Sequence, residues 1–158
     1  MAKIMRATDA ISGAQATAFI TIDGVRYVLM QMISFEAKME IKSGEVAILG
    51  RTGKGSKPAG WVGTWKGRAH YNQSVLRQMW LQYKNKGVLP AMDIQVTNED
   101  PTASVGRQTV ILKECFTKGG IVTKFDAEAE NLEEDMEGTF DDWEMPEKFS
   151  LIAGMRTE

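Results

Sequence analysis

The chain has 158 residues, of which 43% are hydrophobic and 25% charged, and this length is typical of one globular domain that buries its own core. The single cysteine, Cys115, excludes an intrachain disulfide, and its apolar neighbours favour a small buried side chain over a reactive thiol. No apolar run approaches the roughly 18 residues of a membrane-spanning helix. Lys3 and Arg6 are not followed by an apolar stretch, so no signal peptide is predicted and we expect a cytoplasmic protein.

Charge is unevenly distributed along the chain although the net charge is only −2. Residues 1–125 carry 17 basic against 9 acidic side chains, whereas residues 126–147 carry 11 acidic side chains and no basic one. Such asymmetry favours electrostatic partnering, and the partner here can be a second copy of the chain.

The N-terminal half predicts an arm followed by strands. Residues 1–15 lack periodicity and predict a flexible N-terminal arm, before a single domain over 16–150 and a C-terminal tail over 151–158. Ala16–Ile22 is rich in β-branched residues, and the following Asp23-Gly24 pair is the favoured type I′ hairpin turn.

The run Val25–Phe35 is apolar on both faces, with Val28, Met30 and Met32 on one side. A half-solvated strand alternates, so this run predicts either a central strand or a strand with one face covered by another subunit. The next segment, Phe35–Ile41, does alternate, and its apolar positions predict an inward face made of Phe35, Ala37, Met39 and Ile41.

The remaining elements alternate between loops, strands and one helix. Residues 50–60 are rich in glycine and lysine and predict a long flexible loop, after which Trp61–Tyr71 predicts a strand. A helix with a 3.6-residue apolar stripe is predicted between an N-cap at Asn72 and a stop at Gly87. Further strands are predicted at Met92–Thr97, Gln108–Phe116, Ile121–Phe125 and Glu133–Phe140. The fold class is therefore mainly β, a barrel or sandwich closed by one flanking helix.

No motif of an enzyme or of a cofactor, metal or nucleotide site is convincing. The Gly50–Lys57 segment has phosphate-loop spacing, but Ser56 stands where lysine is required and a strand follows instead of a helix. His70 is the only histidine, and no cysteine or histidine cluster supports it as a metal ligand or catalytic base. The acids of residues 126–147 lack calcium-loop spacing and favour a solvated or interface-facing surface over a hydrolase site. A basic loop next to Trp61 and Trp65 also suits nucleic acid, although the net charge argues against it.

A series of short motifs covers nearly the whole chain, from about Ile11 to Phe149. Its members are Ile11–Gly13, Asp23-Gly24, Phe35–Ala37, Ser43–Val46, Gly63-Thr64, Lys86-Gly87, Leu132–Glu134 and Asp142–Lys148. In this order they resemble the tail-tube proteins of PBSX-type defective prophages and related contractile phage tails.

The resemblance implies a β-barrel-like structural subunit, not an enzyme, that forms hexameric rings stacked into a tube. It implies tail sheath, baseplate and tail-terminator proteins as partners, DNA only as a passenger through the lumen, no membrane binding and no cofactor. It also implies a virion tail protein assembled in the host cytoplasm. The tube of a headless phage-tail-like bacteriocin is an alternative, and a nucleotide-binding module using residues 50–60 is an alternative of another class.

Charge and hydrophobicity predict three assembly surfaces within this frame. The subunit interface is predicted at Val28, Met30 and Met32. A stacking loop is predicted from Arg51, Lys54, Lys57 and Trp61, which would contact acids of the next ring. An acidic inter-ring or lumen face is predicted from Glu133, Asp135 and Glu137.

Overall fold

The computed structural model describes residues 4–156 and consists mainly of β-strands with one α-helix. The elements are η1 (Ala7–Asp9), β1 (Ala16–Ile22), β2 (Val25–Val28), β3 (Met32–Ala47), β4 (Lys54–His70), α1 (Val75–Lys86), β5 (Met92–Glu99), β6 (Arg107–Thr117) and β7 (Glu133–Glu147). The strands form one sheet in the order β2-β1-β5-β6-β7-β4-β3, and every neighbouring pair is antiparallel. The predicted fold class, mainly β with one flanking helix, is confirmed. No helix of the described residues is long and apolar enough to span a membrane.

The two edge strands of the sheet, β2 and β3, are consecutive in the chain and are joined by Leu29, Met30 and Gln31. The Leu29 amide donates to the Ala18 carbonyl at 2.8 Å, and the His70 amide donates to the Gln31 carbonyl at 3.0 Å. These bonds tie the connection to both ends of the sheet, which therefore curls. The continuous strand predicted over Val25–Phe35 is wrong, because the chain must turn here to pass from one edge of the sheet to the other.

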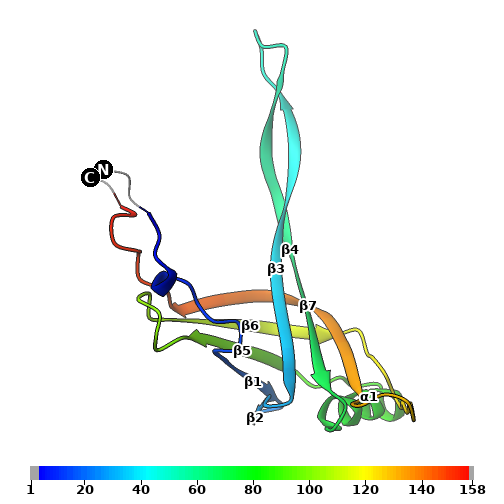
Figure 1. Ribbon diagram of the computed structural model, residues 1–158. Helices are drawn as coiled ribbons and strands as arrows, with labels where there is room; N and C mark the ends of the chain where they lie inside the picture. Colours follow the sequence, from blue (N-terminus) through cyan, green and yellow to red (C-terminus); the bar gives the residue numbers. More distant parts are fainter. Residues whose placement is uncertain (1–3, 157–158) are drawn as a thin grey trace.

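The β3–β4 hairpin projects far beyond the rest of the sheet (Figure 1). β4 pairs with β7 only from Gly63 to His70, and its first part, from Lys54, pairs with β3 alone. The flexible loop predicted over 50–60 is therefore wrong from Lys54 onward. Glycine and proline usually mark turns, but here the opposite strand supplies backbone partners as far as the pair Ala47 and Lys54.

β7 belongs to two parts of the sheet. Its first residues pair with β4 up to Phe140, and residues from Gly138 to Glu147 pair with β6. Beyond Phe140 the hairpin and β7 separate (Figure 1). The body of the sheet consequently has two open edges, β2 and the second half of β7.

The core lies on the face of the curled sheet against which α1 packs. It contains Ile20, Ile22, Trp65, Ala69, Met79, Met92, Ile94, Leu112, Cys115, Met136 and Phe140. Helix α1 ends as predicted at Gly87, whose φ of 73° is left-handed, but it is preceded by Ser74 and not by Asn72 as N-cap. Burial confirms the inert Cys115 and raises the pKa of its thiol to about 12.

The strand predicted over Ile121–Phe125 is absent, and these residues form an irregular segment between β6 and β7. The Ile121 carbonyl is instead an acceptor for the Arg77 guanidinium at 3.4 Å, and Phe125 is exposed. β-Branched composition alone does not make a strand where no neighbouring edge offers backbone partners.

Candidate assembly interface

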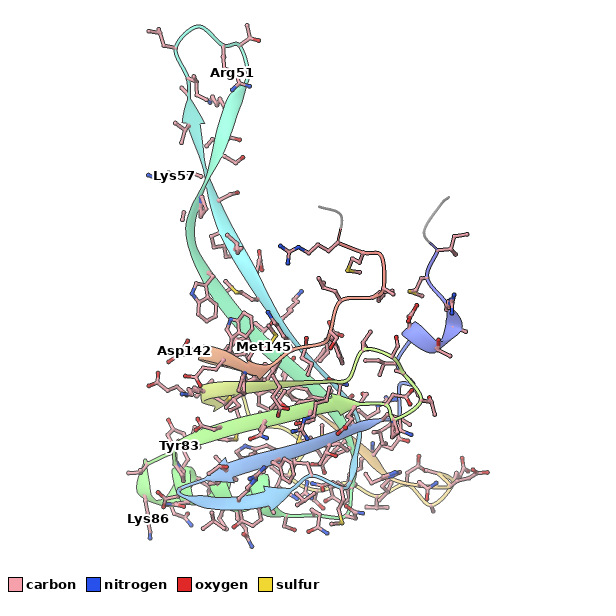
Figure 2. All side chains as sticks on the ribbon, turned by 90° about the vertical axis from the view of Figure 1, so that its left-hand side faces the viewer. Arg51, Lys57, Tyr83, Lys86, Asp142 and Met145 are labelled. Carbon is pink, nitrogen blue, oxygen red and sulfur yellow. The ribbon has the colours of Figure 1, made fainter. Side chains whose placement is uncertain are left out.

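The basic residues predicted to mediate stacking lie along the projecting hairpin (Figure 2). Arg51 is in the turn between β3 and β4, and Lys57 lies further down β4. Neither makes an ion pair within residues 4–156, whereas Lys54 lies 3.7 Å from Glu45 across the hairpin. Trp61 is different: it is half-buried with its ring 6.0 Å from that of Phe140, so it anchors the base of the hairpin.

The apolar positions of β3 reveal a surface that sequence reasoning placed in the core. Phe35 is half-buried and its ring lies 6.1 Å from that of Trp65, as an inward residue should. Met39 and Ile41, further along the hairpin, are exposed, and Leu49 at the tip is fully exposed. The alternating pattern was real, but beyond the body of the sheet the hairpin has no layer behind it.

A group of acidic side chains lies at the opposite end of the molecule from the hairpin tip. Asp126, Glu128 and Glu130 occupy the irregular segment before β7, next to α1 (Figure 1). None of these three carboxylates has an ion-pair partner among the described residues. Unpaired positive charge and unpaired negative charge thus occupy the two ends of one subunit.

The strand face of Glu133, Asp135 and Glu137 carries both signs of charge once its neighbours are included. Arg68 on β4 lies 3.5 Å from Glu133 and 3.2 Å from Asp135. Lys66 is the cross-strand partner of Glu137 and lies 3.9 Å from Glu36 on β3. The acidic stretch is therefore largely compensated by the strand beside it, which the sequence alone did not reveal.

Val28, Met30 and Met32 do not share one strand face, but they lie together around the β2–β3 connection. Val28 ends β2, Met32 begins β3, and Met30 between them is 85% exposed. All three line a groove of about 560 Å³ between the β1–β5 side of the sheet and β3. The groove provides an apolar surface at the seam of the curled sheet.

Histidine and carboxylate chemistry leaves little for an active site. Within residues 4–156, no three His, Cys, Asp or Glu side chains are grouped so that they hold a metal ion. His70 is exposed at the end of β4, opposite Glu133 in the β4–β7 register. The features that stand out on this surface are exposed apolar residues, open strand edges and separated charges.

Comparison with known proteins gives a family match and a shared fold. A family model described as phage tail tube protein matches residues 3–147. Over 146 residues the chain is 28% identical to the phage-like element PBSX protein XkdM of Bacillus subtilis (strain 168), covering 92% of this chain and 97% of that protein. It is 27% identical over 144 residues to the uncharacterized protein YqbM of the same strain, covering 91% and 95%.

Two solved assemblies contain chains with a similar fold. One is the baseplate of the anti-feeding prophage, with a TM-score of 0.65 and 11% identity over 89% of this chain and 97% of that chain. The other is the PVC sheath-tube complex of an extracellular contractile injection system in its extended state, with a TM-score of 0.63 and 12% identity over 86% and 90%. At these identities the likeness concerns the fold.

Proposed function

The chain belongs to the phage tail tube family and is a structural subunit of a tail tube, and we propose that its copies close into hexameric rings that stack inside a contractile sheath. The observation that carries this proposal is the β3–β4 hairpin, whose outer part has no third strand in its own subunit and exposes Ile41 and Leu49. Exposed apolar arms of this kind indicate a partner. The family is structural, and we propose that the subunit catalyses no reaction.

Ring closure uses the seam around Val28, Met30 and Met32. A side chain as exposed as Met30 contributes nothing to the fold of its own subunit, whereas burial of a methionine contributes roughly 1.5–3 kcal/mol. The groove beside these residues offers the neighbouring subunit a concave apolar site. Closed rings repeat this contact at every subunit boundary.

Stacking uses the charges at the two ends of the subunit. Arg51 and Lys57 on the hairpin reach toward Asp126, Glu128 and Glu130 of the next ring, because a contact between two different patches propagates along an axis. Each exposed pair contributes only about 0–1 kcal/mol, but the contact is repeated around the ring. Leu49 at the tip adds apolar burial to the same contact.

The lumen is lined in part by the compensated face of Glu133, Asp135 and Glu137 with Arg68 and Lys66. A lining rich in unpaired basic groups would bind phosphate strongly and hold the DNA. Here the basic groups already lie beside carboxylates, at 3.2–3.9 Å. Such a surface allows DNA to pass without retaining it.

The remaining partners follow from the same role. Tail sheath, baseplate and tail-terminator proteins would contact the tube at its outer wall and its two ends. We place the subunit in a virion tail that is assembled in the host cytoplasm. The capsid that separates a phage from a headless bacteriocin lies outside this subunit.

Negative-stain electron microscopy of the purified full chain tests the proposal. Rings at low concentration and hollow tubes at higher concentration are the expected result. A chain that stays monomeric at every concentration and binds ATP would refute the tube and favour a nucleotide-binding module.

A further inference from the structure

The body of the sheet ends in two open strand edges at opposite sides of the subunit. One edge is β2, which pairs only with β1. The other is the second half of β7, residues 141–147, which pairs only with β6 because β4 leaves β7 after Phe140. Open edges carry unpaired backbone N–H and C=O groups and are templates for pairing with another chain.

The core-side faces of the two edges are both apolar. Tyr27 on β2 lies opposite the buried Ile20, and Trp143 on β7 lies opposite the buried Leu112, so both side chains are on the core side of the sheet. Each remains more than a third exposed because no further strand covers it. Two half-covered aromatic side chains at the two ends of one sheet would complete each other if the ends met.

The opposite faces of the two edges carry opposite charges. Arg26 neighbours Tyr27 on β2 and therefore points to the other face, where its guanidinium lies over the Phe19 ring at 3.9 Å. Asp142 precedes Trp143 on β7, at the free edge beside the base of the hairpin (Figure 2). Within the described residues neither Arg26 nor Asp142 has an ion-pair partner.

Strand direction decides how the edges can pair. Four successive antiparallel pairings separate β2 from β7, so the two strands run in the same direction within a subunit. Rotation about a ring axis preserves this relation, and β2 of the next copy would therefore pair with β7 in parallel. The register that sets Arg26 beside Asp142 also sets Tyr27 beside Trp143 and Val28 beside Glu144, so both faces match at once.

We propose that β2 of one copy pairs in parallel with residues 141–147 of β7 in the next, which makes the sheet continuous around the ring. This inference rests on the proposed tube function and names the surface that meets the Val28 side of the seam. The two edges differ, so the contact is head-to-tail and each subunit uses both.

Cross-linking of the full chain tests the pairing directly. Val28→Cys combined with Glu144→Cys, treated with a short bifunctional maleimide, is expected to give a ladder of covalent oligomers ending at the ring. Each single variant alone is expected to give no ladder, and Cys115 does not compete because it is buried with a thiol pKa of about 12. Tubes that form without any cross-link would overturn the pairing, as would dimers from Glu144→Cys alone, which indicate β7 paired with β7.

Charge exchange provides a second test that does not depend on the cross-linker. Arg26→Asp or Asp142→Arg alone is expected to lower the ring population at least tenfold, with the circular dichroism of the subunit unchanged. The double variant is expected to restore rings. Rings in the parent protein without rescue in the double variant, together with absent cross-links, would refute this pairing and leave the tube function standing. A parent protein that forms no rings would refute the tube function itself.

Discussion

Arg77 on α1 and Glu134 at the start of β7 form an ion pair of 2.6 Å in which the two side chains are only 16% and 8% exposed. The Arg77 guanidinium also donates to the Ile121 carbonyl and lies over the Tyr71 ring at 4.4 Å. One side chain therefore fixes the helix to the sheet and to the irregular segment before β7.

Arg77→Leu is expected to destabilise the subunit by about 3–5 kcal/mol, because it leaves the Glu134 carboxylate buried without a partner. Urea unfolding at neutral pH, under conditions where rings are dissociated, measures this difference. Arg68→Leu is the matched control, since its ion pairs are exposed and are worth less than about 1 kcal/mol. Equal effects of the two substitutions would contradict the structural role of Arg77.

Met30→Asp is expected to weaken ring formation while the subunit remains folded, since Met30 is exposed at the seam of the sheet. Sedimentation reports the ring population, and circular dichroism reports the fold. Leu49→Asp, an equally exposed apolar residue at the hairpin tip, should leave rings intact and shorten tubes. An unfolded Met30→Asp variant would place this residue in the core and refute the interface.

Arg51→Glu with Lys57→Glu is expected to give rings or short stacks in place of long tubes, because like charges then meet between rings. The parent tubes should also shorten as salt rises, since the Debye length falls to about 3 Å at 1 M. Tube length in micrographs is the measurement. Lys54→Glu alone is expected to have a smaller effect, because Lys54 is already near Glu45. Tubes of normal length from the double variant, at low and high salt, would refute charge-based stacking.

Gly63→Ala is expected to destabilise the subunit by about 1–3 kcal/mol, because an added methyl group would collide with the Phe140 ring. Thermal unfolding of the dissociated subunit gives the difference. Gly53→Ala in the hairpin turn faces open space and is the control, with an expected effect near zero. A neutral Gly63→Ala variant would mean that the ring of Phe140 moves freely, against the packing described.

Acid is expected to release the N-terminal segment from the turn between β5 and β6. The Thr102 hydroxyl donates to Asp100 at 2.6 Å and the Ser12 amide donates to it at 2.9 Å, and these bonds lower the pKa of the Asp100 carboxyl. A lowered pKa contributes stability above the ordinary aspartate value of about 3.9, and this stability is lost as the pH falls through the folded-state pKa. Amide exchange at Ser12 should accelerate below about pH 4, and Asp100→Asn should show faster exchange already at neutral pH. Exchange that ignores both pH and the substitution would show that Asp100 does not hold Ser12.

Local signals in the sequence predicted the local structure well. Asp23-Gly24 makes the tight turn with both φ angles positive, at 53° and 83°, and Gly87 ends α1 in the left-handed region. These outcomes depend on residues within a few positions of each other, so one sequence contains the necessary information.

Features that depend on distant partners were not accessible in this way. The hairpin extends through the glycine-rich stretch because β3 supplies partners, and the chain breaks at Leu29 because it must reach the opposite edge of the sheet. The neutralisation of Glu133 and Asp135 by Arg68 likewise depends on the β4–β7 register, which joins residues more than sixty positions apart. Composition predicted an acidic surface there, and pairing made it a mixed one.

The position of β7 in the sheet gives the chain an order of folding. β7 lies between β6 and β4, and among the paired strands it alone joins the β3–β4 hairpin to the β2-β1-β5-β6 group by backbone hydrogen bonds. It is also the last strand in the sequence, so a ribosome must translate nearly the whole chain before the two halves can join. An unfinished subunit lacks residues 141–147 as well, and nascent chains are thereby kept out of growing rings until synthesis is complete.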